Sequence, residues 1–488
     1  MAKQYDHQNC PPVSITKTIS VYPKILRPQK VLNLSNLDRQ CPILMYLVFF
    51  YNPSPAGKIL TVDSVFNSLK SGLEEALSIW YPAAGRLSLN PSDGKLNLWC
   101  NNKGAVLVEA MSPVKISDLG DLSQYNELLE KLVFKPDFGG NFSDMPLVVG
   151  QVTKFGCGGY SIGIGTSHSL FDGPAAYDFL SAWASASAVL KPNKTTTATA
   201  TSSLPELYKP VHERPLLLLG NSQFRSPPKA VANNLSKTIT TSSGAAAIDH
   251  LYHLIMQAAA EGSLLLTHST PGSSSSTHNN YVLKTFHLSG NLIENLKMQV
   301  FNQNDGFSSS SFEVVAAHLW KARSKALGLK KETMACLQFA VDTRNKVVPP
   351  LPNSFSGNAY VLASVALKAG ELELVSHKTI IQKIREAKNS VNNDYVKAYM
   401  EGLQGPQGGS LPPLKELTIV SDWTRMPFHK VEFLHGHAAA YASPLLTPIP
   451  QVAYFIQNPN DNKGIHVRIG LLQQYVDAFS RYFLTAGR

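Results

Sequence analysis

The chain lacks the long apolar runs that mark membrane proteins and secreted proteins. Within its 488 residues, no uninterrupted apolar run approaches the ~18 residues that cross a bilayer. The N-terminal segment is polar and has no apolar core of the kind found in secretory signal peptides. These absences predict a soluble, cytoplasmic protein without a membrane span.

Cysteine is scarce and scattered, so a disulfide framework is not expected. The chain has 5 cysteines, an odd number without the spacing of zinc ligands. They are Cys10, Cys41, Cys100, Cys157 and Cys336. His435 and His437 lie close together, but no carboxylate or thiol cluster completes a metal site near them. We therefore expect reduced thiols and no bound metal.

Clustered positive charge is also absent, although the formal net charge is +10. The basic residues are spread along the chain and form no recognisable nucleic-acid motif with aromatic residues, so we expect no nucleic-acid partner. The hydrophobic content of 44% is typical of a globular protein. A chain of this length is too long to fold around a single hydrophobic core, which suggests two domains.

The most informative stretch that is present is Gly-Thr-Ser-His-Ser-Leu-Phe-Asp-Gly at residues 165–173. Two apolar segments before it, 146–155 and 160–164, predict strands joined by a glycine-rich turn. Asp172 is suited to cap the helix that follows, because a proline falls in the first turn of that helix. His168 is thus predicted at the end of a buried strand, where an imidazole of ordinary pKa near ~6.5 can serve as a general base.

Other segments predict further elements. Residues 61–80 predict a helix with one apolar face. Residues 96–100 and 105–108 predict a β-hairpin, and residues 380–399 predict a single amphipathic helix. Tracts rich in Ser, Thr and Gly between residues 195 and 280 bury little apolar surface, and we expect mobility there.

Several motifs occur together with the His168 segment. They are Tyr81-Pro-Ala-Ala-Gly-Arg-Leu87, His168-Ser-Leu-Phe-Asp172-Gly173, Phe312-Glu-Val-Val-Ala-Ala-His-Leu-Trp320, Asp342-Thr-Arg344 and Ser356-Gly-Asn358. In this order they resemble the plant BAHD family of acyl-CoA-dependent acyltransferases, and the resemblance extends over nearly the whole chain.

The resemblance implies an α/β fold of two similar domains of the chloramphenicol-acetyltransferase-like (CoA-dependent acyltransferase) type, joined by a long crossover. We expect an N-terminal domain that carries the His-x-x-x-Asp motif over residues 1–205. The crossover and a Ser/Thr-rich insertion would occupy residues 206–280, and the C-terminal domain residues 281–488. A monomer is expected.

The resemblance also implies that the acceptor attacks the thioester directly, with His168 as general base and no acyl-enzyme. The absence of a Gly-x-Ser-x-Gly elbow agrees with this. Ser421 and Trp423 match family positions whose hydroxyl and indole N–H face the thioester carbonyl, although a packed strand with a buried Trp would give the same pattern. Asp172 has two interpretations: a partner that orients His168, or, as we prefer, one member of a structural pair with Arg344.

One motif departs from the family. Where the family has Asp-Phe-Gly-Trp-Gly, this chain has Glu432-Phe-Leu-His-Gly436. This difference puts in doubt the geometry of the part of the active site that binds the coenzyme. Gly173, Arg344 and Glu432 are assigned to structural support. The resemblance assigns coenzyme A contacts to small polar residues in two segments: Ser309, Ser310, Ser356, Gly357 and Asn358.

The implied function is transfer of an acyl group from acyl-CoA, a co-substrate rather than a permanently bound cofactor, to a small plant metabolite. The acceptor group would be a hydroxyl, with an amine as the second choice, and a phenylpropenol or a steroid-like alcohol is the expected type of acceptor. The alternative is a non-catalytic accessory protein of fatty-acyl elongation. Retention of the catalytic motifs argues against that alternative.

Overall fold

The computed structural model divides into two units, each with its own large sheet. The residues described are 11–53, 60–137, 141, 143–187, 208–218, 281–300, 307–402, 414–434, 440–442, 445 and 449–485. Unit 1 consists of residues 1–218, 352–358 and 426–446, and unit 2 consists of residues 219–351, 359–425 and 447–488. The expected boundaries followed chain order and did not anticipate that two C-terminal segments fold with unit 1. Apart from 208–218, the expected crossover and insertion lie outside the described residues.

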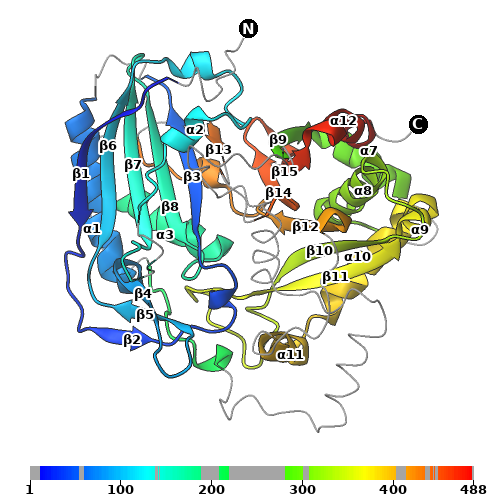
Figure 1. Ribbon diagram of the computed structural model, residues 1–488, viewed down its shortest axis with the longest axis horizontal. Coiled ribbons are helices and arrows are strands. Elements are labelled where there is room, and N and C mark those ends of the chain that lie inside the picture. Colours follow the sequence, from blue (N-terminus) through cyan, green and yellow to red (C-terminus); the bar gives the residue numbers. More distant parts are fainter. Residues whose placement is uncertain are drawn as a thin grey trace, which may run out of the picture. The chain divides into compact units, whose positions relative to one another are not determined.

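Unit 1 is built on a 6-stranded mixed sheet (Figure 1). Its strands are, in spatial order, β1 (Ser14–Val21), β6 (Ala105–Ser112), β7 (Val148–Phe155), β8 (Tyr160–Ser167), β3 (Leu44–Tyr51) and β13 (Ala440–Ala442). The β6–β7 pair is parallel and the other neighbours are antiparallel. Every residue of β3 and β8 is buried, so His168 follows directly on a strand in the core of unit 1.

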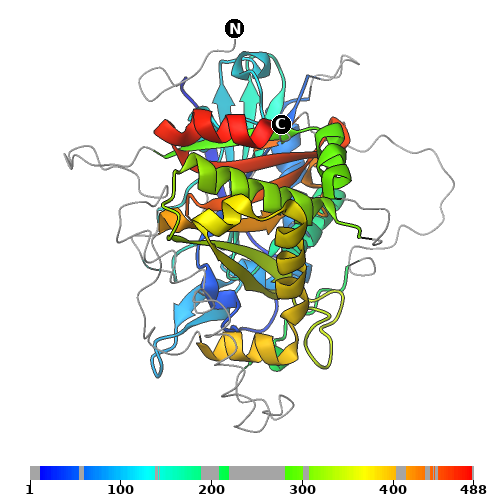
Figure 2. The ribbon, with the colours of Figure 1, turned by 90° about the vertical axis from the view of Figure 1, so that its right-hand side faces the viewer.

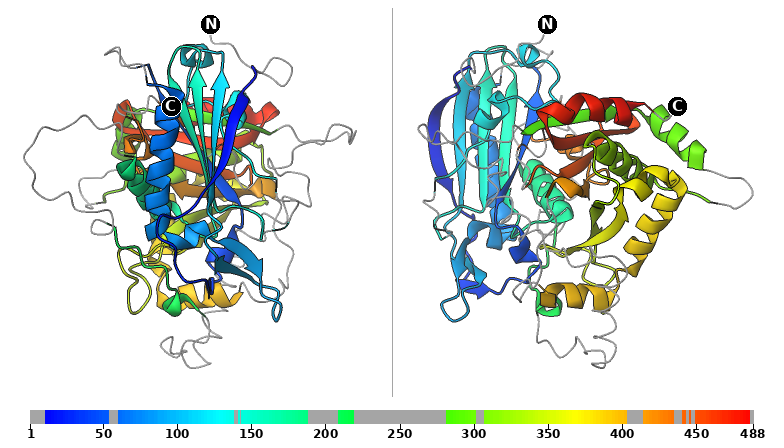
Figure 3. Two further views of the ribbon diagram at one scale, coloured as in Figure 1. Left: turned by 90° about the vertical axis from the view of Figure 1, so that its left-hand side faces the viewer. Right: turned by 45° about the vertical axis from the view of Figure 1, so that its right-hand side comes forward.

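Helices α1 (Val62–Ile79) and α3 (Gly173–Ala186) pack against each other, and α1 lies over the sheet of unit 1 (Figure 3). Both begin where the sequence predicts. Thr61 Oγ1 accepts a hydrogen bond from Ser64 N at 3.2 Å, and Asp172 Oδ1 accepts one from Ala175 N at 3.1 Å. A short helix, α2 (Leu128–Lys131), precedes β7.

A second, 3-stranded sheet in unit 1 corrects the predicted hairpin. It consists of β2 (Lys30–Leu32), β5 (Leu96–Cys100) and β4 (Arg86–Leu89). The hairpin prediction is wrong because β5 pairs with β2 and β4, whereas β6 pairs with β1 and β7. Asn102 (φ 56°) and Gly104 (φ 76°) take left-handed conformations and turn the chain from one sheet into the other.

Unit 2 is also built on a 6-stranded sheet, which confirms the α/β class with two sheet-containing parts. Its strands are, in spatial order, β11 (Tyr360–Lys368), β10 (Met334–Asp342), β12 (Leu417–Asp422), β14 (Val452–Asn458), β15 (Asp461–Leu472) and β9 (Tyr281–Leu288). Figure 2 shows α8 (Ser311–Ala326), α10 (His377–Ser390) and α12 (Val476–Leu484) lying over one face of this sheet. The remaining helices of unit 2 include α7 (Gly290–Val300) and α9 (Ala369–Leu374).

The single helix predicted over residues 380–399 is instead two helices, α10 and α11 (Asn393–Gly402). Val391 has extended backbone angles and ends α10. Asn392 Oδ1 then accepts a hydrogen bond from Tyr395 N at 2.9 Å, as a capping side chain does at a new helix start. Across the described ranges, no helix has the length and apolar character needed to span a membrane.

Candidate active site

His168 occupies the position directly after β8, as the sequence predicts. Its backbone N–H donates to Ile43 O at 2.9 Å, which ties it to the residue before β3. The side chain is half-buried, although its neighbours Ser167 and Ser169 are fully buried. The imidazole is therefore held by the core of unit 1 and keeps a solvent-accessible part.

Asn358 holds the imidazole from a distant part of the chain. Its Nδ2 donates to His168 O at 2.7 Å and to Asp38 Oδ1 at 3.2 Å. Both of these atoms can only accept, so the amide nitrogen must face them and the amide oxygen must face the ring. Asn358 Oδ1 lies 3.1 Å from His168 Nδ1, which must then carry the hydrogen. The second ring nitrogen, Nε2, is left as the unprotonated proton acceptor of the neutral imidazole.

A buried ion pair supports Asn358. Asp38 and Arg214 have fully buried side chains, and Arg214 Nε lies 2.9 Å from Asp38 Oδ2. Asp38 also accepts from Asn358 N at 3.0 Å and from Ser35 Oγ at 2.7 Å. Burial alone would raise the pKa of Asp38, but Arg214 and these donors hold it below its ordinary value. The carboxylate is therefore ionised and fixes the orientation of the Asn358 amide.

The electrostatic setting keeps His168 neutral. Burial lowers the pKa of His168 below its ordinary value of 6.5, and weaker opposing effects of its own backbone, Asp172 and Asn358 do not offset this. A neutral ring at physiological pH is the form that can take a proton.

Asp172 caps α3 through the bond to Ala175 N and is 4% exposed. In a triad, the orienting carboxylate would accept from His168 Nδ1, and here that nitrogen faces Asn358 Oδ1. This favours the structural interpretation of Asp172. Arg344 Nη1 lies 2.9 Å from Asp342 Oδ2 within unit 2. The Asp172–Arg344 pair would join the two units and stays a prediction.

The segment that contains the altered motif packs against α3. Phe428 packs on Tyr177 with 5.5 Å between ring centroids, and Phe433 packs on Trp183 at 5.3 Å. Gly173 makes room for this segment, because a Cβ there would come within 2.6 Å of the sulfur of Met426. The Phe that survives in the altered motif is thus a core residue of unit 1.

The rest of the altered motif is described only in part. Tyr51 Oη accepts from the backbone N–H of Phe433 at 3.2 Å, which anchors the motif to β3. Glu432 beside it is exposed. His435 and Gly436 lie outside the described residues.

The residues expected to stabilise the oxyanion lie at the end of β12 in unit 2. Trp423 Nε1 donates to Ser421 Oγ at 2.9 Å, so the Ser421 hydroxyl is left with its own hydrogen to donate elsewhere. Both side chains are half-buried. Their roles toward a thioester stay predictions.

The residues expected to contact coenzyme A include one helix cap. Ser310 Oγ accepts from Glu313 N at 3.2 Å and Glu313 Oε2 accepts from Ser310 N at 3.0 Å, which forms a capping box at the start of α8. Ser356, Gly357 and Asn358 are buried. Coenzyme A contacts by these residues and by Ser309 remain predictions.

Sequence reasoning missed Asp38, Arg214 and the hold of Asn358 on the imidazole. Asp38 lies in the segment Leu34-Ser-Asn-Leu-Asp-Arg-Gln40, whose mixture of polar and apolar residues gives no sign that this carboxylate is buried. Its partners lie 176 and 320 positions away, a separation that no local pattern discloses.

Comparison with known proteins places the chain among acyltransferases. Residues 11–484 match the family described as the Transferase family. The chain is 51% identical over 478 residues to brassinosteroid-related acyltransferase 1 of Arabidopsis thaliana, covering 97% of this chain and 98% of that protein. It is 28% identical to omega-hydroxypalmitate O-feruloyl transferase of the same plant, covering 92% and 88% of the two chains.

Solved structures with low identity share the fold. The crystal structure of vinorine synthase aligns with a TM-score of 0.66 at 18% identity, covering 96% of both chains. TRI101 of F. sporotrichioides, complexed with coenzyme A and T-2, aligns with a TM-score of 0.63 at 13% identity, covering 92% of this chain and 97% of its own. Both likenesses agree with the two-sheet architecture.

Proposed function

Because this chain belongs to the Transferase family of plant BAHD acyltransferases, we propose that it moves an acyl group from acyl-CoA to the hydroxyl of a small neutral molecule, with His168 as general base. Acyltransferase activity of this type follows from the family. The choice of a hydroxyl over an amine, the use of acyl-CoA as a co-substrate and the role of His168 are the proposal. We also propose that the protein is a cytoplasmic monomer and needs no permanently bound cofactor.

The observation that carries the proposal is the hydrogen bond between His168 Nδ1 and Asn358 Oδ1 at 3.1 Å. It commits Nδ1 to donating, and therefore leaves the lone pair of the neutral ring on Nε2. A base needs that lone pair, whereas a histidine that only supports the structure does not.

The reaction needs no covalent enzyme intermediate. As the acceptor oxygen forms its bond to the thioester carbonyl carbon, Nε2 of His168 takes the hydroxyl proton. The C–S bond then breaks, and the departing coenzyme A sulfur takes that proton from the imidazolium. The Ser421 hydroxyl, fixed by the Trp423 indole, is a candidate donor to the oxyanion and could contribute about 3 kcal/mol of transition-state stabilisation.

For the acceptor we favour a steroid-like alcohol over a phenylpropenol. The support is the 51% identity, over nearly all of both chains, to a protein named a brassinosteroid-related acyltransferase.

The test is coenzyme A release by the full-length protein with a panel of acyl-CoAs and alcohols. We expect His168→Ala to lower turnover by about 10² to 10⁴, the usual contribution of a positioned general base, while acyl-CoA binding and the melting temperature stay close to wild type. His287→Ala, an exposed histidine on β9, is the matched control. Wild-type turnover in His168→Ala would rule out the base. No release by the wild type with any acceptor would favour the accessory-protein alternative.

A further inference from the structure

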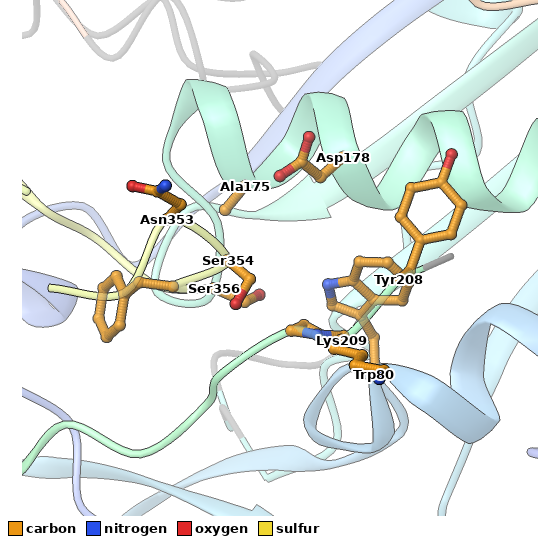
Figure 4. Close-up of a pocket in the computed structure, with 10 residues that line it drawn as sticks. Trp80, Ala175, Asp178, Tyr208, Lys209, Asn353, Ser354 and Ser356 are labelled. Carbon is orange, nitrogen blue, oxygen red and sulfur yellow. The ribbon is translucent and has the colours of Figure 1, made fainter. Parts of the chain in front are cut away.

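A cavity of about 310 Å³ lies within unit 1, and His168 is not among the residues that line it (Figure 4). The end of α1, the first turns of α3, the segment 208–210 and the loop 353–356 enclose it. The residues that line it are Trp80, Ala175, Asp178, Tyr208, Lys209, Pro210, Asn353, Ser354, Phe355 and Ser356.

The walls of this cavity are fixed by hydrogen bonds and ring contacts. Val211 N donates to Ser354 O at 2.9 Å, and Ser356 N donates to Val211 O at 2.8 Å, so the two strand-like walls are joined. The Trp80 ring packs on Tyr208 at 5.7 Å and on Phe179 of α3 at 5.8 Å between centroids. A site with such preformed walls loses little conformational freedom when a ligand binds.

Two polar atoms in the cavity wall have no hydrogen-bond partner within the described part of the chain. They are Nε1 of Trp80 and Oγ of Ser356, in residues that are only 2% and 3% exposed. In Figure 4 the edge of the Trp80 indole that carries the nitrogen is turned toward Ser354 and Ser356. Buried polar atoms are normally paired, so two unpaired ones in the wall of a cavity point to a hydrogen-bond partner from outside the described chain.

The charge of the lining selects a neutral ligand. Asp178 and Lys209, both exposed at the rim, contribute opposite charges, and the other lining residues are uncharged. These two charges cancel, so the lining has no net charge to compensate a phosphate, a carboxylate or an ammonium group that leaves water to enter the cavity. The Trp80 ring instead offers an apolar surface to a ring system, with the hydroxyl and amide groups of Asn353, Ser354 and Ser356 around it.

We infer that this cavity is a substrate subsite for a neutral, polyhydroxylated ring molecule, with Trp80 Nε1 and Ser356 Oγ bonding one of its oxygens. This inference gives the Ser356 hydroxyl to the acceptor and replaces the coenzyme A contact that the family resemblance implies for it. The inference rests on the proposed function, in which an alcohol of this class is the acceptor. One loop links the subsite to the base, because Ser356 lies two positions before Asn358, which holds His168. The subsite binds the hydroxylated body of the acceptor and excludes acidic compounds of the same size.

Calorimetric titration of the full-length protein with three steroid probes tests the subsite. Hydrocortisone is neutral and carries several hydroxyls, its 21-phosphate adds negative charge, and progesterone lacks the hydroxyls. We expect hydrocortisone to bind at least about tenfold more tightly than either of the others, because progesterone lacks the hydroxyls that bond the polar groups of the lining and the phosphate would bring a charge into it. Equal affinities for the three probes, or no binding of hydrocortisone, would overturn the inference.

Variants locate the binding site. Trp80→Phe keeps the ring and removes the N–H, and Ser356→Ala removes the hydroxyl; each should weaken hydrocortisone binding about threefold to tenfold without lowering the melting temperature by more than a few degrees. Asp178→Asn should reduce the difference in affinity between hydrocortisone and its 21-phosphate. Trp99→Phe, a half-exposed tryptophan on β5, and Ser117→Ala, an exposed serine, are the matched controls. Identical affinities in Trp80→Phe and Trp99→Phe would show that the cavity holds only water.

Coenzyme A release separates this inference from the proposed function. Release that depends on His168 but has wild-type acceptor KM in Trp80→Phe and Ser356→Ala would overturn the subsite and leave the acyltransferase intact. Hydrocortisone binding that depends on Trp80 in a protein that releases no coenzyme A with any acceptor would support the subsite and overturn the acyltransferase.

Discussion

At the scale of single residues, the ability of His168 to accept a proton depends on the side-chain amide of Asn358. That amide donates to Asp38 and to His168 O, and its oxygen accepts from His168 Nδ1. The orientation of the amide therefore determines which ring nitrogen of His168 carries the hydrogen. Any change that frees this amide lets the ring hydrogen move to Nε2, and the base is then lost for that fraction of molecules.

Replacing Asn358 by Ala should therefore lower kcat by about tenfold or more, corresponding to ~1.4 kcal/mol. The pH profile of kcat/KM tests whether this loss comes from the effect of Asn358 on His168. In the wild type, activity should rise with an apparent pKa below 6.5, because burial lowers the pKa of His168. The bond from Asn358 raises that pKa, so its loss should move the profile to still lower pH.

Asn460→Ala, in an exposed turn, is the control for this experiment. A profile in Asn358→Ala that coincides with that of the wild type would mean that the amide does not act on the ring.

The second prediction at this scale concerns the stability that the buried Asp38–Arg214 ion pair gives to the fold. Both side chains are fully buried, so Asp38→Asn or Arg214→Met alone leaves an uncompensated buried charge and should cost about 3 to 5 kcal/mol of unfolding free energy. The double variant should cost less than the sum of the two, which urea unfolding of all four proteins measures. The exposed Lys368–Glu332 pair at 3.0 Å is the reference cycle, with an expected coupling of about 0 to 1 kcal/mol. Additive costs for Asp38 and Arg214 would contradict the pairing.

These residues mark the limit of what sequence predicts about the site. The His-x-x-x-Asp-Gly motif is local, so the place of His168 after a buried strand and the capping role of Asp172 followed from neighbouring residues. The partners Asp38, Arg214 and Asn358 come from three separated segments, and Asn358 was assigned only to coenzyme A. Its hold on the ring depends on tertiary packing that sequence spacing does not encode.

At the scale of elements, capping side chains set where helices begin and also link their stability to pH. In α8, Glu313 closes the capping box and binds Arg385 at 3.0 Å and Lys388 at 3.1 Å. Burial alone would raise its pKa, but Arg385, the Ser310 N–H and Lys388 together lower the pKa of Glu313 to about 2. A carboxyl whose pKa is lower in the folded state than its ordinary 4.5 stabilises the fold when it is ionised.

Glu313→Gln should therefore lower the unfolding free energy most at neutral pH. The difference from wild type should be constant above the ordinary value of 4.5 and shrink as pH falls toward 2, where the native carboxyl is protonated as well. Urea unfolding at pH 7, 5, 4 and 3 gives the curve. Glu294→Gln, whose carboxylate makes a partly exposed pair with Lys297 on α7, is the control and should show a smaller effect. A Glu313→Gln difference that grows on acidification would contradict this assignment.

Element prediction succeeded where caps and apolar periodicity agreed, as in α1 and α3. It failed where a polar residue inside a periodic pattern started a new helix, at Asn392, and where left-handed residues moved the chain between sheets, at Asn102 and Gly104. In both failures, a short backbone feature overrode a pattern that looked continuous in sequence.

At the scale of the whole molecule, unit 1 is not contiguous in sequence. Residues 352–358 supply Asn358 to the base, and residues 426–446 supply Phe428 and Phe433 to α3 and β13 to the edge of the sheet beside β3. A division by chain order would therefore cut through one core.

The fragment 1–218 should consequently fail to fold alone. Without the later segments, the rings of Trp183 and Phe49 lose their contacts with Phe433, β3 becomes an exposed edge, and the Asp38 carboxylate loses the Asn358 donors. We expect weak near-ultraviolet circular dichroism and no cooperative urea transition for this fragment, whereas the full chain shows both. Co-expression with a fragment of residues 281–488 restores these segments and should recover a cooperative transition. Co-expression with the same fragment carrying Asn358→Ala and Phe433→Ala is the control, and it should recover less. A fragment 1–218 that unfolds as cooperatively as the full chain would mean that unit 1 is complete without them.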